Sequence, residues 1–174
     1  ARPRAARVRL DFGTSDARSF PSAFAAVGHT PRSRAHGEAQ RGWLQFSALT
    51  PIMEIGGTGS HAPWNMPTEP KFDTELIEIY ARYVKLHHAL IPYTAAQADL
   101  ASTEGLPIAR AMIFDFPNDA RFADSWDQYM YGPDLLVAPI WQIGSRERQV
   151  LIPEGVWKLY WDQSQSWTGP ATIT

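Results

Sequence analysis

Two side chains whose types could contact a bound molecule lie in a Gly- and Pro-rich stretch at residues 56–70. An imidazole can hydrogen-bond a ligand and an indole can stack on it, and this stretch holds one of each, His61 and Trp64. Long loops inside compact proteins are often functional, so we expect residues 56–70 to form an irregular functional loop. A plain loop or packing role for both side chains is the alternative.

Three other groupings suggest bound ions, but each lacks the spacing that ion binding requires. The neighbouring His87 and His88 would point about 100° apart on a helix, so they cannot chelate one metal together. The Gly-rich run at 56–59 is followed by no Lys-Ser or Lys-Thr pair, so it is not a phosphate loop. An acidic strip that could bind calcium lacks the EF-hand order and is expected to be a solvated surface: Asp115, Asp119, Asp124 and Asp127. We therefore predict no metal and no cofactor.

The composition is that of a soluble globular protein, with 44% hydrophobic and 20% charged residues among 174. The absence of cysteine excludes disulfides and thiolate metal sites, and it leaves the cellular compartment undetermined. No apolar stretch approaches membrane-spanning length and no signal peptide is visible, so we expect no membrane partner. Seven tryptophans suit stacking on sugar rings, but composition alone favours their packing in a core.

Positive charge is concentrated at the start of the chain. Residues 1–41 hold eight arginines against three carboxylates, and the remaining residues reverse that balance. A head rich in Arg, Ser and Ala would suit a transit peptide or a nucleic-acid-binding arm. Because it has almost no hydrophobic periodicity, we instead interpret residues 1–42 as a truncated or disordered segment, and we expect no nucleic-acid partner.

Helices are predicted in the middle of the chain. One begins at Asp73, whose carboxylate can cap the first turn, and Pro92 must kink or end it. A second runs over residues 93–104 and stops at Gly105, a natural left-handed cap. A largely buried helix, broken near Pro51, is expected over residues 43–53. The buried stripe of the Asp73 helix is predicted to be Leu76, Ile79, Tyr83, Leu86 and Leu90.

After residue 105 the pattern changes to short apolar runs separated by Pro, Gly, Asn and Asp turns. Helices followed by strands suggest a domain boundary at this point. An aromatic turn is expected at residues 129–133. The predicted strands are residues 107–116, 135–141, 148–152 and 156–161.

Four stretches of the chain, in this order and spacing, carry a family resemblance. They are Arg41-Gly42-Trp43-Leu44-Gln45-Phe46 through Pro51-Ile52-Met53; Phe72-Asp73 through Leu90-Ile91-Pro92-Tyr93; Gly105-Leu106-Pro107-Ile108-Ala109-Arg110 through Phe116-Pro117-Asn118-Asp119 and on to Pro139; and Val150-Leu151-Ile152-Pro153-Glu154-Gly155-Val156-Trp157 with Trp161. Together they resemble glycoside hydrolase family 31, the family of α-glucosidases, α-xylosidases and sulfoquinovosidases.

The resemblance implies an α/β fold in two incomplete parts. In the family a (β/α)8 barrel is followed by β-sandwich domains, so residues 43–104 would be the last helices and loops of the barrel. Residues 105–174 would be the start of an antiparallel β-sandwich, and residues 1–42 match poorly. A whole barrel needs about 250 residues, so only its C-terminal fragment can be present. An exposed barrel surface would also favour self-association.

The resemblance also implies a retaining mechanism, which needs a nucleophilic and a protonated carboxyl about 5 Å apart. Asp11 stands before Phe20-Pro21-Ser22-Ala23, about where the family places its acid/base. No nucleophile is identified. Ile55 occupies the position of the family's sugar-binding His, and three nearby side chains could contact sugar instead: Glu54, His61 and Trp64.

The sequence therefore predicts a retaining glycoside hydrolase of α-glycosidase type that acts on O-glycosyl bonds of a carbohydrate substrate, an α-glycoside. It predicts an incomplete catalytic module that is inactive alone, so whether this chain is an enzyme stays open. One alternative is a non-catalytic carbohydrate-binding or scaffold module, and another is a non-functional fragment.

Overall fold

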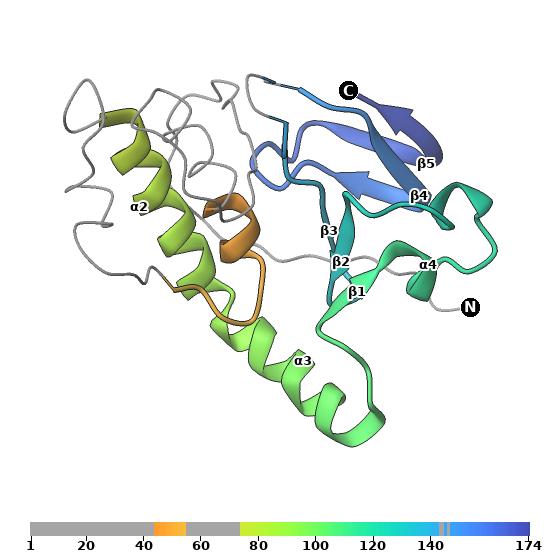
Figure 1. Cartoon of the computed structure of the whole chain (residues 1–174), viewed down its shortest axis with the longest axis horizontal. Coiled ribbons are helices and arrows are strands. Elements are labelled where there is room, and N and C mark those ends of the chain that lie inside the picture. The colour runs from red at the N-terminus through yellow and green to blue at the C-terminus, as the bar shows by residue number, and fades with distance from the viewer. Residues whose placement is uncertain (1–43, 55–73, 143–144, 146) are drawn as a thin grey trace.

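The computed structural model describes residues 44–54, 74–142, 145 and 147–174. The first of two long helices lies beside a small central sheet, the second extends away from it, and a two-stranded hairpin lies next to the sheet (Figure 1). None of the helices in the described part of the chain combines the length and the hydrophobicity that a membrane-spanning helix needs. The elements are a short helix at 44–48, α2 (Thr74–Ala89), α3 (Ile91–Glu104), β1 (Ala109–Ala111), α4 (Met112–Asp115), the 3-10 helix η1 (Ala120–Phe122), β2 (Tyr129–Tyr131), β3 (Leu135–Val137), β4 (Val150–Lys158) and β5 (Ser166–Ile173).

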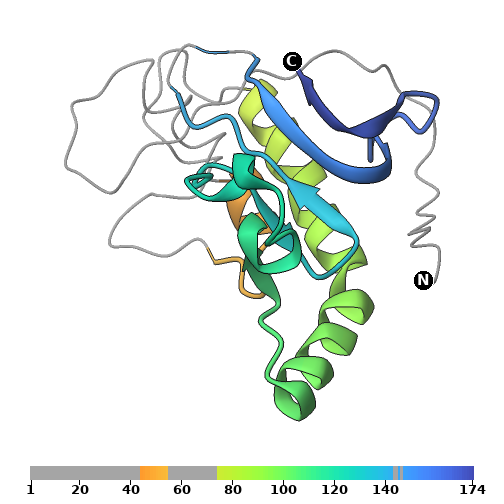
Figure 2. The same ribbon diagram turned by 90° about the vertical axis from the view of Figure 1, so that its right-hand side faces the viewer.

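The two long helices follow the prediction from sequence. Helix α2 ends at Ala89 and α3 begins at Ile91, because Pro92 fits only the first turn of a helix, where a missing N–H costs no hydrogen bond. Helix α3 ends at Gly105, which has φ 72° and donates its N–H to the carbonyl of Ala101 at 3.2 Å. Both views show α3 extending away from the sheets (Figure 2).

The helix predicted over residues 43–53 is confirmed only at its start. It ends after Ala48, and the Thr50 hydroxyl donates to the carbonyls of Ser47 and Ile52, both at 2.8 Å. Pro51 disfavours helical geometry in the residue before it, which limits the helix to little more than one turn. The expected burial of Ile52 is wrong, since 77% of its side chain is exposed.

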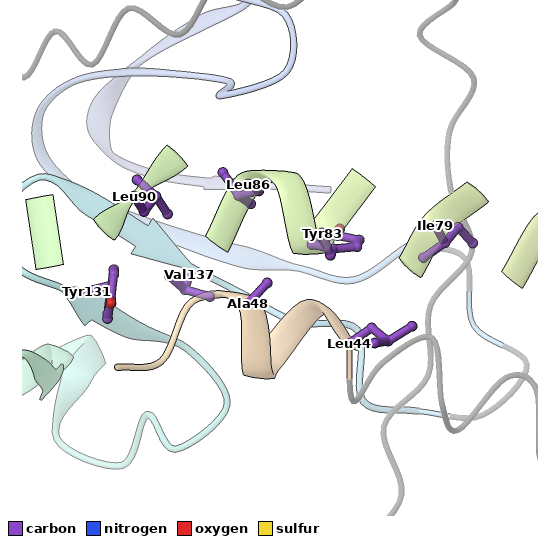
Figure 3. Packing of buried hydrophobic residues seen from close by; sticks show 8 residues of the cluster. All are labelled: Leu44, Ala48, Ile79, Tyr83, Leu86, Leu90, Tyr131 and Val137. Carbon is purple, nitrogen blue, oxygen red and sulfur yellow. The ribbon is translucent and has the colours of Figure 1, made fainter. Parts of the chain in front are cut away.

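The main core lies between α2, the 44–48 helix and the central sheet (Figure 3). The predicted stripe supplies half of its buried members, Ile79, Tyr83, Leu86 and Leu90, and each large apolar side chain buried there contributes about 1.5–3 kcal/mol. The side chain of Leu76 lies outside the described residues. A smaller cluster lies over α4 and η1 and contains Met112, Phe122 and Met130. The buried members of the main core are Leu44, Ala48, Ile79, Tyr83, Leu86, Leu90, Tyr131 and Val137.

The central sheet has the antiparallel order β1-β2-β3 and differs from the prediction in two places. The strand expected at 107–116 is only three residues long, because α4 takes over at Met112. The aromatic turn expected at 129–133 is wrong for its first three residues, which form the middle strand. Met130 and Tyr131 are fully buried there, and the turn itself begins at Gly132. The strand predicted at 135–141 ends early, at Val137.

The hairpin is also more continuous than predicted. The two strands expected at 148–152 and 156–161 are one strand, β4, whose pairing with β5 shifts register between Ile152 and Gly155. This irregularity accommodates Pro153, which has no N–H to give to a ladder. Strand β5 was not predicted, because Gly169 and Pro170 interrupt its pattern. Helices and antiparallel sheets are thus combined in one chain.

Tyrosines join the helices to the central sheet. The Tyr129 hydroxyl donates to the Leu49 carbonyl at 3.0 Å, and the Tyr93 hydroxyl donates to the Tyr131 carbonyl at 3.1 Å. The Tyr131 hydroxyl in turn lies 2.7 Å from that of Thr94. Burial raises the pKa of Tyr93 and of Tyr129 above the ordinary value, so both remain protonated donors.

We predict that Gly132→Ala is strongly destabilising. Gly132 has φ 59°, and a Cβ there would overlap the Tyr93 ring, whose hydroxyl holds the carbonyl of Tyr131. The left-handed backbone and the displaced hydrogen bond together should lower the free energy of unfolding by about 2–4 kcal/mol. Urea denaturation followed by circular dichroism measures this change.

Gly105→Ala is the matched control. Gly105 also has a positive φ, 72°, but nothing lies within 4 Å of the position that an alanine methyl group would take there. The free energy of unfolding should therefore fall by only about 1–2 kcal/mol, the cost of holding alanine in a left-handed backbone conformation. Equal losses in the two variants would show that the contact with Tyr93 is unimportant.

Candidate functional site

Most of the predicted site residues lie outside the described residues. Asp11, His61 and Trp64 belong to this group, so their roles stay predictions. Glu54 is described, and its side chain is exposed in the irregular segment that follows the 44–48 helix.

Three aspartates of the described part are bound to arginines. Asp115 pairs with Arg110 at 3.3 Å, with 9% and 6% of the two side chains exposed. Asp119 accepts from the Nε of Arg121 at 2.9 Å, and Asp127 pairs with Nη2 of Arg148 at 2.7 Å. The contact with Arg121 stabilises the ionised carboxylate of Asp119, whereas a general acid must hold its proton. None of these pairs resembles the acid half of a retaining site.

The pKa shifts of two aspartates indicate that these carboxyl groups are ionised. Hydrogen bonds from Arg121 lower the pKa of Asp119 below its ordinary value. Hydrogen bonds from the Ser164 hydroxyl and the Gln165 amide likewise lower the pKa of Asp162, which closes the turn between β4 and β5. Both carboxyls are therefore ionised structural acceptors.

The histidine pair and the acidic strip do not bring metal ligands together. In the described part of the chain, no group of three or more His, Asp or Glu residues could hold a metal ion. His87 instead places Nδ1 3.1 Å from the Ala48 carbonyl, joining α2 to the 44–48 helix.

Two side chains of the 116–128 segment hold the hairpin. The Gln128 amide pairs with both backbone groups of Leu151, accepting at 3.0 Å and donating at 2.8 Å, as a neighbouring strand would. Arg121 donates to the carbonyls of Ile152 and Ala171, both at 3.2 Å. These two carbonyls belong to paired residues of β4 and β5, so one guanidinium contacts both strands.

A surface hollow of about 230 Å³ lies where the chain passes from the central sheet to the hairpin. Arg148 organises it: Nη2 lies 2.7 Å from the Asp127 carboxylate, and Nη1 donates to the carbonyls of Asp127 and Pro139. Its Nε donates to the Gln149 carbonyl at 3.0 Å. The lining residues are Asp127, Ile140, Trp141, Gln142, Ser145, Glu147, Arg148 and Gln149.

Two tryptophans meet beside this hollow. The ring centroids of Trp126 and Trp141 are 4.9 Å apart with an interplanar angle of 55°. Their side chains are 74% and 39% exposed. Composition predicted core packing for tryptophan, and neither residue follows it. A local signal existed, because Ser125 and Asp127 flank one tryptophan and Gln142 follows the other.

The second part of the chain matches a known protein family. Residues 105–173 match the model of the glycosyl hydrolase family 31 C-terminal domain. The α-xylosidase of Saccharolobus solfataricus is 32% identical over 140 residues, which are 80% of this chain and 18% of that protein. The sulfoquinovosidase of Agrobacterium fabrum is 30% identical over 120 residues, which are 68% of this chain and 18% of that enzyme.

Solved structures of family 31 enzymes are also similar to this chain. A family 31 dextranase from Flavobacterium johnsoniae superposes with a TM-score of 0.71 at 32% identity, covering 79% of this chain and 16% of its own. The family 31 α-xylosidase of Xanthomonas citri gives 0.70 at 35% identity, covering 79% and 15%. The chain thus spans less than a fifth of the length of these relatives.

We predict that Asp119 makes stability depend on pH. Because its pKa is lowered by folding, the folded state binds fewer protons than the unfolded state, and stability rises with pH. The contribution is present above the unfolded pKa of about 3.9 and is lost as the pH falls through the lower folded pKa. Asp119→Asn should therefore flatten the dependence of the urea midpoint on pH below about pH 5.

The control for that measurement is Asp124→Asn, which removes an exposed carboxylate from the same segment. If the two variants change the acid limb of the stability curve equally, the Arg121 contact is not its source.

Proposed function

Because this chain is a portion of a family 31 glycosyl hydrolase that includes its C-terminal domain, we propose that it supports the active site of a retaining α-glycosidase. The reaction would be the hydrolysis of an O-glycosyl bond in a carbohydrate substrate. The family match over residues 105–173 is the observation that carries the proposal. Relatives named α-xylosidase and sulfoquinovosidase support a glycoside substrate.

In this proposal the 44–48 helix, α2 and α3 are the last elements of a (β/α)8 barrel. The strands after residue 105 then begin an antiparallel β-sandwich packed against the barrel. The shared core supports this arrangement, because Leu86 of α2 and Leu90, which follows that helix, are buried in one cluster with Tyr131 and Val137 of the central sheet. A supporting domain fixed in this way would hold the barrel's last helices in place.

The catalytic carboxyl groups would lie outside the described residues. Retaining hydrolysis needs two free carboxyl groups about 5 Å apart, and three of the described aspartates, Asp115, Asp119 and Asp127, are engaged in ion pairs with arginines. We keep Asp11 as the proposed acid/base, with Glu54, His61 and Trp64 as proposed sugar contacts. The nucleophile would belong to a barrel strand that precedes the matched region.

A non-catalytic carbohydrate-binding role is the second candidate. The exposed pair of Trp126 and Trp141 favours it, because large exposed aromatic side chains beside polar groups are typical of binding surfaces. This role is compatible with support of a glycosidase.

We predict that the purified 174-residue chain does not hydrolyse aryl α-glucosides or α-xylosides. Its turnover, followed by release of nitrophenol, should be at least about a thousandfold below the 1–10³ s⁻¹ of ordinary enzymes, because one catalytic carboxylate is missing. A longer gene product that adds an in-frame barrel sequence should hydrolyse at least one of these substrates. Ordinary turnover by the short chain, or none by the longer one, would contradict the proposal.

A further inference from the structure

We propose that Trp126 and Trp141, together with the hollow beside them, form a binding surface for a neutral oligosaccharide. The inference deepens the proposed carbohydrate function, on which it rests, by assigning a site and a ligand class within the described residues. One sugar ring would lie on the exposed indole pair, and its hydroxyl groups would bond to polar side chains of the hollow.

The exposure of the two indoles is the first reason. Trp126 is 74% exposed although it touches Trp141, so most of one indole surface is open to solvent. Tryptophan has a large apolar area to bury, and leaving it open forgoes that stabilisation unless a partner covers it. A pyranose ring presents a face of C–H groups, which suits an aromatic surface of this size.

The pair is also held in position before any ligand arrives. Arg148 donates to the carbonyl of Asp127, the residue after Trp126, and to the carbonyl of Pro139, two residues before Trp141. Its ion pair with the Asp127 carboxylate adds a third contact to the same segment. The side chain of Arg148 is 12% exposed, so this linkage is largely protected from solvent. A preformed surface loses less entropy on binding.

The polar groups of the hollow select a neutral, hydroxyl-rich ligand. Amides of Gln142 and Gln149 and the hydroxyl of Ser145 can both donate and accept, as sugar hydroxyls do. The carboxylates of Asp127 and Glu147 outnumber the one guanidinium, and that guanidinium already bonds to protein oxygens. The surface therefore disfavours anionic ligands.

The size of the hollow limits what it can hold. Its volume of about 230 Å³ is below the roughly 300–1,000 Å³ of sites that enclose a whole small molecule. One ring of an oligosaccharide fits such a space, with the rest of the chain running over the surface. Binding should accordingly be weak, with a dissociation constant on the order of 1 mM.

The test is a titration of the full chain with maltotriose, isomaltotriose and xylotriose by saturation-transfer difference NMR. At least one of them should bind in the millimolar range, and trigalacturonate should bind at least about tenfold more weakly. Trp126→Ala should weaken binding at least about tenfold, and Trp126→Phe should weaken it less, because it keeps an aromatic face. Circular dichroism verifies that each variant is folded.

Phe114→Ala is the matched control, because Phe114 is another exposed aromatic residue, 49% exposed, on α4. It should leave binding unchanged. Three results would overturn the inference: no binding of any neutral trisaccharide, stronger binding of trigalacturonate, or equal losses in Trp126→Ala and Phe114→Ala. Burial of Trp126 against a second copy or the rest of a longer chain would appear as the first result. The binding assay needs no hydrolysis, so its failure leaves the proposed function to be decided by the nitrophenol assay.

Discussion

Three-residue strands leave the backbone around them short of hydrogen-bond partners, and side chains supply the missing bonds in this protein. Buried N–H and C=O groups are costly when unpaired, so a small sheet of this kind depends on such substitutes. Gln128 pairs with Leu151 as a strand would, and Arg121 contacts carbonyls of both hairpin strands. The hydroxyls of Tyr93 and Tyr129 likewise donate to the backbone carbonyls of Tyr131 and Leu49, respectively. The packing of helices, sheet and hairpin into one body follows from these contacts.

This use of polar side chains restricts the chemistry available nearby. Asp115, Asp119 and Asp127 are each bound to an arginine, so their carboxylate oxygens are occupied by structural contacts. The described region is consequently suited to hold other elements in place. That agrees with the match of residues 105–173 to the C-terminal domain of a glycosyl hydrolase family.

Arg148 shows how the same structural contacts shape the surface. By joining the carbonyls of Asp127 and Pro139, it brings together two segments that are separate in sequence. Trp126 and Trp141 then meet beside a polar hollow instead of entering the core. A contact that stabilises the passage between sheet and hairpin thus also creates the molecule's most exposed pair of indoles among the described residues.

The sequence by itself determined the long helices, the end of α3 and the family. Helical periodicity, the missing N–H of Pro92 and the left-handed preference of Gly105 are local properties, so they can be read without tertiary contacts. Only the tertiary structure decided that residues 129–131 form the middle strand, because that depends on partners on both sides. It also decided that Trp126 stays exposed. Burial is a property of the whole arrangement, and indole chemistry suits a core and a binding surface equally well.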